Sequence, residues 1–185
     1  MLDFSYASRG QVSTLDELGR VLSNVVTIVP AGVVVFFPSY DYEQVVFRHL
    51  EKSGVMAKIS ARKAVFREER GKSSDHVLES YSKSIRLSGG AALFAVVGGK
   101  MSEGINFSDN LGRCVVMVGL PYPNLHSPEL KEKMRYLDRT AAEVEGKRGG
   151  AVHYDNLCMK AVNQSVGRAI RHKNDYAAIL FLDHR

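Results

Sequence analysis

At 185 residues the chain has the size of a single domain, a little above the usual range of roughly 100–150 residues. Hydrophobic residues make up 45% of it, which excludes disorder as the default interpretation because that share can form a core. The net charge of +5 and the pI near 9.2 are compatible with a polyanionic partner but do not require one.

Helical and strand periodicities alternate along the chain, beginning with a helix over residues 13–29. A strand over 33–37, a helix over 41–52 and a weak strand near 55–59 follow. Residues 60–76 are a polar and basic surface segment, and after it the sequence predicts a helix over 75–88 and a strand over 91–97. The remainder predicts a strand over 114–119, a long charged helix opened by Ser127, a loop over 146–150, a helix over 155–171 and a strand over 177–182. Apolar strands separated by helices predict a mainly parallel sheet in a three-layer α/β/α domain.

The cysteines and the hydropathy of the chain indicate the cellular compartment in which the protein works. Cys114 and Cys158 lie far apart and lack metal-site spacing, so we expect buried thiols in a reducing compartment. No segment approaches about 18 uncharged apolar residues, and the N-terminus lacks a basic-then-apolar signal pattern. The sequence therefore predicts a soluble, intracellular protein with no membrane partner and no metal ligand set.

The turn over residues 38–41 is the first candidate site, because ligands of parallel α/β sheets bind where the strands end. Pro38 and Ser39 are ordinary turn formers, and Asp41 suits the N-cap of the next helix, so a purely structural role stays open. The Ser39 hydroxyl and the Tyr40 phenol also suit contact with a phosphate or stacking on a base.

The second candidate is the glycine-rich segment over residues 98–107, directly after the predicted strand 91–97. Its spacing is not that of a Walker A loop, which needs four residues between the first glycine and a Gly-Lys-Ser/Thr end. Its polar content, carried by Lys100, Ser102, Glu103 and Asn106, is high for a connection between two buried strands. That content favours a functional role, whose kind the chemistry alone leaves open.

The third candidate is the predicted helix over residues 155–171. At about 100° per residue, Lys160, Gln164, Arg168 and Arg171 fall on one face, and such a stripe is usually a solvated basic surface. Gly167 inside this helix would cost about 1 kcal/mol relative to alanine, which indicates a close approach there. Neither arginine has an acidic neighbour three or four residues away on the predicted helix, and two such guanidinium groups suit a triphosphate.

At these three segments the sequence resembles the XPD-like iron–sulfur group of superfamily 2 DNA helicases. Residues 36–40 resemble that group's motif IV, residues 99–107 its motif V, and residues 164–171 its Gln-x-x-Gly-Arg-x-x-Arg motif VI. Residues 119–124 and 181–185 also fit, so the likeness runs in order over nearly the whole chain. The segment 97–110, with Asn rather than Asp at position 106, is most similar to the Chl-type branch that serves sister-chromatid cohesion.

The resemblance implies a motor of two RecA-like domains that hydrolyses ATP in the cleft between them and moves 5′ to 3′ on single-stranded DNA. It implies that Arg168 and Arg171 are arginine fingers that reach the γ-phosphate, and that Gln164 helps to sense it. Residues implied to couple the nucleotide to DNA at the domain face are Glu103, Gly104 and Asn106. Candidates for contact with the DNA backbone are Ser39, Tyr40, Lys100 and Ser102.

The chain carries no Walker A loop, no Asp-Glu-Ala-His segment and no four-cysteine cluster, all of which belong to the first half of this family. We therefore expect residues 1–185 to form the helicase C-terminal, second RecA-like domain, a P-loop NTPase-like fold without the P-loop, with the N-terminal ATP-binding half absent. ATP and Mg²⁺ would be held mainly by that half, and an iron–sulfur cluster is expected in the full-length protein. The expected partners are single-stranded or forked DNA and the N-terminal half, in a monomeric nuclear protein of DNA repair and chromosome cohesion.

A second interpretation stays open, in which the chain is a RecA-like module for nucleic-acid binding or protein docking that no longer catalyses. The presence of both Arg168 and Arg171 argues against it, because such a module has no need for the pair. A nucleotide-binding enzyme of another kind is a remote third option, which the missing phosphate loop disfavours. By itself the chain is expected to show no appreciable ATPase or unwinding activity.

Overall fold

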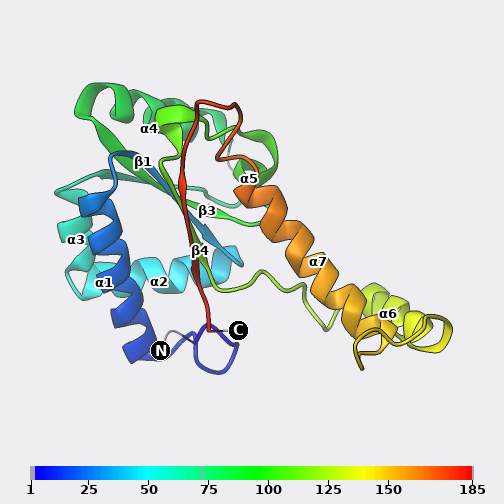
Figure 1. The fold of residues 1–185 in the computed structure, drawn as a ribbon. Coiled ribbons are helices and arrows are strands. Elements are labelled where there is room, and N and C mark those ends of the chain that lie inside the picture. The colour runs from blue at the N-terminus through cyan, green and yellow to red at the C-terminus, as the bar shows by residue number, and fades with distance from the viewer. Residues whose placement is uncertain (1–2, 72, 185) are drawn as a thin grey trace.

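The computed structural model describes residues 3–71 and 73–184, except for the surroundings of residues 103 and 104. The helices are α1 (Val12–Ile28), α2 (Tyr40–Lys52), α3 (Val55–Ser60), α4 (Asp75–Ser88), α5 (Lys100–Gly104), α6 (Pro128–Thr140) and α7 (Gly149–Val166), with a 3-10 turn, η1, at Asp109–Leu111. The strands are β1 (Ala31–Phe37), β2 (Ala64–Arg67), β3 (Gly90–Val96), β4 (Cys114–Val118) and β5 (Ala178–Leu182). Helices lie on both sides of the strands (Figure 1), so the predicted three layers are confirmed.

The described strands form one sheet in the order β2-β3-β1-β4-β5, and every pairing between neighbours is parallel. β1, β3 and β4 are buried along their whole length, which explains their continuous apolar sequences. The predicted α/β class with a mainly parallel sheet is confirmed. Because the strands run the same way, the segments that follow β1, β3 and β4 meet at one edge, which we call the carboxyl edge.

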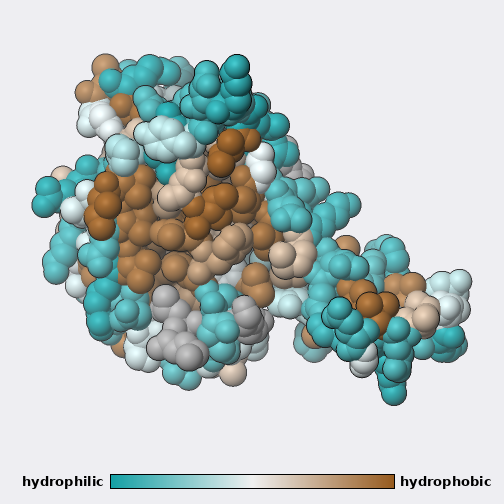
Figure 2. Space-filling view, viewed as in Figure 1, coloured by the Kyte–Doolittle hydropathy of each residue, from teal (hydrophilic) through white to brown (hydrophobic). Residues whose placement is uncertain are grey.

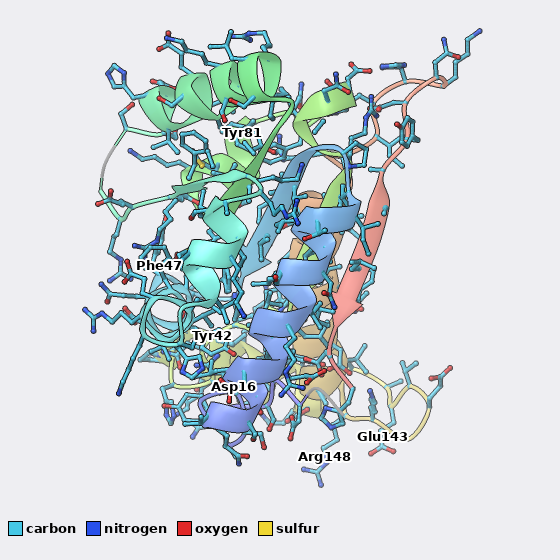
Figure 3. The ribbon with its side chains drawn as sticks, turned by 90° about the vertical axis from the view of Figure 1, so that its left-hand side faces the viewer. Asp16, Tyr42, Phe47, Tyr81, Glu143 and Arg148 are labelled. Atoms are coloured by element: carbon cyan, nitrogen blue, oxygen red, sulfur yellow. The ribbon has the colours of Figure 1, made fainter. Side chains whose placement is uncertain are left out.

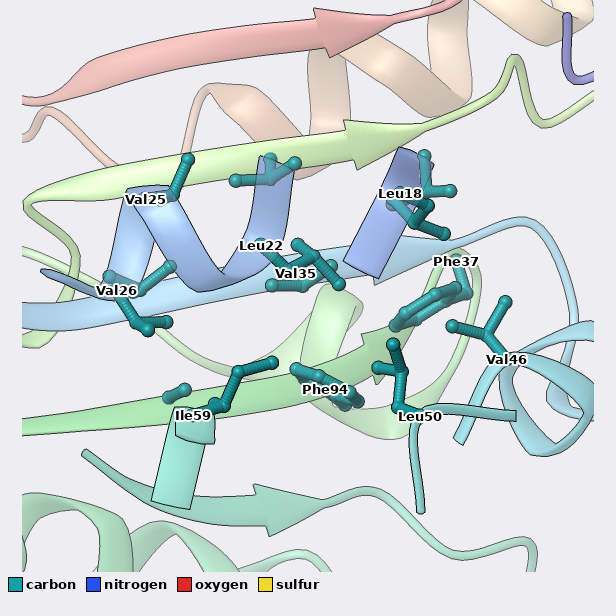
Figure 4. Close-up of a cluster of buried hydrophobic side chains, with 14 of the residues drawn as sticks. Leu18, Leu22, Val25, Val26, Val35, Phe37, Val46, Leu50, Ile59 and Phe94 are labelled. Carbon is teal, nitrogen blue, oxygen red and sulfur yellow. The ribbon is translucent and has the colours of Figure 1, made fainter. Parts of the chain in front are cut away.

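Helices α1, α2 and α3 cover one face of the sheet (Figure 4). Leu18, Leu22 and Val26 recur every four residues in α1, which places them on the side of the helix that faces the sheet. They belong to the same buried cluster as Phe37 of β1 and Phe94 of β3, whose ring centroids lie 5.4 Å apart. Each such side chain contributes roughly 1.5–3 kcal/mol when it is fully buried, so this layer holds β1 and β3 firmly in place.

Helices α4 and α5 and the end of α7 cover the opposite face. Tyr81 points from α4 toward the sheet (Figure 3), where its ring meets that of Phe66 edge-on with 6.0 Å between centroids. Its hydroxyl donates a 2.6 Å hydrogen bond to the Leu111 carbonyl, and burial raises the pKa of Tyr81 well above its usual value. In the same layer Phe107 packs against Phe36 of β1, which ties the segment after α5 to the core.

On the β2 side of the sheet one local prediction is wrong, and one strand was not predicted. Residues 55–59, expected as a weak strand, belong to helix α3, where Met56 and Ile59 are both buried at a helical spacing. Residues 64–67, which lie within the predicted polar and basic surface segment, form the edge strand β2, which pairs with β3. A four-residue edge strand with mostly half-buried side chains carries too little apolar periodicity to be recognised from sequence.

Helices α6 and α7 pack against each other and project from the body of the domain as a helical hairpin (Figure 1). No residue of α6 is buried, in keeping with its charged sequence. Apolar side chains gather on the surface along the β5 edge of the sheet (Figure 2). Phe181 of β5 is half-exposed. In the part of the chain that the structure describes, every helix is too short or too polar to cross a membrane.

Both cysteines are buried, as predicted. Burial raises the pKa of the Cys114 thiol in β4 to about 11. At neutral pH this thiol is therefore protonated and poorly nucleophilic, which fits a packing role.

Candidate functional site

A pocket of about 420 Å³ opens at the carboxyl edge of the sheet. Pro38 follows β1, Gly98 follows β3 and Pro121 follows β4, and all three line it. Gln164, in the last turn of α7, and Arg168, just beyond that helix, complete the polar part of the wall. The pocket therefore lies where parallel α/β sheets bind their ligands.

Arg168 brings a cationic group with spare hydrogen-bonding capacity to this pocket. Its side chain is half-buried, and its Nε atom is buried without a hydrogen-bond partner among the described residues. Its backbone carbonyl accepts a 3.0 Å hydrogen bond from the N–H of Phe107, which fixes the residue against the buried segment after α5. A buried guanidinium nitrogen without an acceptor destabilises the domain unless a ligand accepts its hydrogen bond, and a phosphate oxygen suits that role.

Arg171 is exposed and lies beside the glycine-rich segment. Its Nη2 atom donates a hydrogen bond to Oδ1 of Asn106. Neither Arg171 nor Arg168 forms an ion pair with a carboxylate that the structure describes. The structure thus brings the expected arginine fingers to the segment that resembles motif V, and leaves both guanidinium charges without a carboxylate partner in that region.

The helix that was expected to carry both arginines ends earlier than predicted. α7 stops at Val166, and Gly167 follows it as the C-cap residue. Arg168 and Arg171 therefore belong to the connection between α7 and β5, and they do not share a helical face with the polar residues of α7. Gly167 is therefore not a mid-helix glycine as expected; it has a right-handed helical backbone, with φ −64°. A Cβ atom at this position would lie 2.9 Å from the carbonyl oxygen of Asn163 in α7.

The turn after β1 is held by its own polar groups. Ser39, rather than Asp41, caps α2, because its Oγ accepts a 3.2 Å hydrogen bond from the N–H of Tyr42. The Tyr40 hydroxyl donates a 2.9 Å hydrogen bond to Oε1 of Glu68, and burial together with that bond raises the pKa of Tyr40 to about 12. This turn therefore has the structural role that the sequence left open. The two groups predicted to contact DNA, the Ser39 hydroxyl and the Tyr40 phenol, already form hydrogen bonds within the protein.

The glycine-rich segment folds into the short helix α5, which begins at the exposed Lys100. Ser102 is buried and lines the pocket, while its Oγ donates a 2.9 Å hydrogen bond to the carbonyl of Gly99. Of the predicted DNA contacts, Lys100 is thus the one that is exposed and charged. Glu103 and Gly104 lie in α5, but their surroundings fall outside what the structure describes.

Two polar contacts that hold this site were missed by sequence reasoning. The carboxylate of Glu68, directly after β2, is buried and accepts hydrogen bonds from the backbone N–H groups of Val96 and Met101. The carboxylate of Asp175 accepts a 2.9 Å hydrogen bond from Nη1 of Arg113, which fixes the connection that carries both arginines. No local pattern reveals them, because Val96 lies 28 positions from Glu68 and Asp175 lies 62 positions from Arg113.

The family of helicase C-terminal domains matches residues 22–185. This match spans the parallel sheet and every segment that lines the carboxyl-edge pocket. The chain belongs to the helicase C-terminal domain family.

Similar proteins place the chain within that family. It is 54% identical over 192 residues to ATP-dependent DNA helicase DDX11 of Danio rerio, across 100% of this chain and 22% of the relative. It is 47% identical over 181 residues to ATP-dependent DNA helicase chl-1 of Caenorhabditis elegans, across 98% of this chain and 21% of the relative. The solved structure XPD_APO superposes with a TM-score of 0.72 at 24% identity, over 98% of this chain and 34% of that one. The resemblance to the XPD-like group and its Chl-type branch is confirmed, and the chain spans about a fifth of the curated relatives.

Proposed function

We propose that the chain acts as the second RecA-like motor domain of an ATP-dependent DNA helicase, and that it completes an ATP site shared with a first motor domain. The observation that carries this proposal is Arg168, whose guanidinium lines the carboxyl-edge pocket with a buried Nε that lacks a described partner. The names of the relatives, which are ATP-dependent DNA helicases, support the reaction class.

The residues of the pocket fit one side of a triphosphate. Arg168 and Gln164 would donate hydrogen bonds to phosphate oxygens, and the cation would stabilise the charge that develops on the transferred group. Bound ATP supplies the phosphoryl group for this transfer. Arg171, held by Asn106, would add a second positive charge and connect the nucleotide to the glycine-rich segment.

The residues that line the pocket indicate which parts of the nucleotide site this chain would supply and which parts the first domain would supply. Among the described residues that line it there is no carboxylate, so Mg²⁺ would be held by the first domain. The likeness to the XPD-like group supports our further proposals of an iron–sulfur cluster outside this chain and of 5′ to 3′ movement on single-stranded or forked DNA. The likeness to the Chl-type branch supports a nuclear role in DNA repair and chromosome cohesion.

The chain alone should hydrolyse ATP no faster than a protein-free control, because it supplies the fingers without the phosphate cradle. Addition of the first motor domain, in trans or by fusion, should produce hydrolysis that single-stranded DNA stimulates. A coupled phosphate-release assay measures both rates. Steady hydrolysis by the 185-residue chain, abolished by Arg171→Ala, would contradict the shared site.

Binding of the chain to single-stranded DNA should be weak and steeply dependent on salt, because most of the affinity comes from contact with phosphates. Lys100→Ala should weaken it similarly for all sequences and should lower the slope of log K against log salt by roughly 0.7, the value for one phosphate contact on a single strand. Fluorescence anisotropy with a labelled oligonucleotide measures both effects. Lys58→Ala, an exposed lysine in α3, is the matched control and should leave the slope unchanged.

A further inference from the structure

A buried carboxylate connects the two loops that carry the predicted DNA contacts. Glu68 directly follows β2 and is 5% exposed. Its Oε1 accepts hydrogen bonds from the Tyr40 hydroxyl at 2.9 Å and from the Met101 N–H at 3.3 Å, and its Oε2 accepts one from the Val96 N–H at 3.0 Å. The three donors come from the start of α2, the end of β3 and the first turn of α5.

Gly99 provides the space that this carboxylate occupies. A Cβ atom at Gly99 would lie 2.5 Å from Oε1 and 2.8 Å from Oε2 of Glu68. The backbone φ of Gly99 is −79°, so the position requires glycine for its lack of a side chain and not for its conformation. The backbone N–H of Glu68 is itself fixed by a 2.8 Å hydrogen bond to the carbonyl of Phe94 in β3. The loop and the carboxylate are therefore fitted to each other.

We infer that Glu68 is a positioning residue of the carboxyl edge. Its carboxylate fixes the glycine-rich loop relative to the turn after β1, and so sets where Lys100 and Tyr40 stand when a DNA strand arrives. Both carboxylate oxygens must be acceptors, because a backbone N–H, which can only donate, meets each of them: that of Met101 at Oε1 and that of Val96 at Oε2. The part of this inference that concerns DNA rests on the proposed function, whereas the positioning of the loop does not.

Glu68→Gln isolates this role. The substitution keeps the shape of the side chain but replaces one acceptor oxygen by an NH₂ group, so that a donor faces a donor and the charge assistance is lost. Glu79→Gln, at an exposed position in α4, removes the same charge and is the matched control.

Backbone amide hydrogen exchange of the 185-residue chain tests the positioning directly. In Glu68→Gln we expect whichever of the Val96 and Met101 amides faces the new NH₂ group to exchange roughly tenfold faster or more, because it loses its hydrogen bond. The other amide keeps an oxygen acceptor without the charge and should be accelerated less. The Val34 amide in the middle of β1 should change much less, and Glu79→Gln should change none of the three. Equal acceleration of all three amides would reduce Glu68 to a general stabilising residue and overturn the inference, as would unchanged exchange at both Val96 and Met101.

Titration with fluorescein-labelled oligo(dT) tests the consequence for DNA. Glu68→Gln should weaken binding about tenfold, and Lys100→Ala added to it should cost less than it does in the wild-type chain, because neighbouring groups that act together are not additive. Full additivity of the two changes would overturn the link between Glu68 and Lys100 even if the exchange result held. Absence of binding by the wild-type chain at low salt would count against the proposed function, and the exchange experiment would still decide the positioning.

Discussion

Replacement of Arg168 by alanine should lower the DNA-stimulated ATPase of the two-domain motor by about 10³-fold or more. Because an arginine finger acts on charge that develops in the transition state, kcat should fall while the KM for ATP changes little. The Nε of Arg168 is already buried and desolvated, so a phosphate oxygen would meet it at little further cost. The measurement is steady-state hydrolysis by the chain combined with its first motor domain and single-stranded DNA.

Two variants separate this effect from a general loss of charge. Arg168→Lys keeps the positive charge but loses the planar fork of donors, so it should restore only a small part of the rate. Arg86→Ala removes a positive charge from an exposed position in the last turn of α4, away from the carboxyl edge, and should leave the rate unchanged. An Arg168→Ala rate within a few-fold of the wild type would favour the docking module without catalysis.

Phe107→Ala should cost about 3–5 kcal/mol of stability, as the loss of a large aromatic side chain from a core usually does. The Phe107 ring is fully buried and meets the Phe36 ring edge-on, with 6.1 Å between centroids. Since a domain is stable by only about 5–15 kcal/mol, the variant should lose a large part of its stability. Thermal unfolding should show a fall in melting temperature on the order of 10 °C.

The same substitution at an exposed phenylalanine provides the control. Phe181 in β5 is 53% exposed, so Phe181→Ala should cost well under half as much. Phe107→Ala should also speed exchange of the position-107 amide, which donates to the carbonyl of Arg168. If Phe107→Ala melted like the wild type, the segment after α5 would not be what holds the arginine in place.

The central strands could be predicted because their physics is local. β1, β3 and β4 are buried on both faces, so each is a continuous apolar run bounded by turn residues. β2 and α3 could not be predicted in the same way, because a short edge strand and a six-residue helix carry almost no periodic signal. The end of α7 was misplaced because the polar spacing of Gln164, Arg168 and Arg171 mimics a helix beyond the point where Gly167 ends it.

The sequence predicts which segments form the site, but it does not predict the contacts that orient the side chains within it. The residues at the carboxyl edge follow strands in the sequence, so their convergence is a consequence of a parallel sheet. The contacts that orient them are not, because the Glu68 carboxylate and the Arg171–Asn106 hydrogen bond join segments that lie far apart in the chain. Sequence alone also could not tell that the Ser39, Tyr40 and Ser102 hydroxyls are already engaged within the protein.

Arginine fingers that act on a transition state should draw the two motor domains together when that state is mimicked. The most direct measurement is the affinity of the chain for the first motor domain with ADP and Mg²⁺, in the presence and absence of aluminium fluoride. We expect the mimic to tighten association of the wild-type chain at least tenfold, and Arg168→Ala to remove that gain without changing the affinity in ADP alone. Equal tightening in wild type and Arg168→Ala would contradict the assignment of Arg168 to the shared nucleotide site.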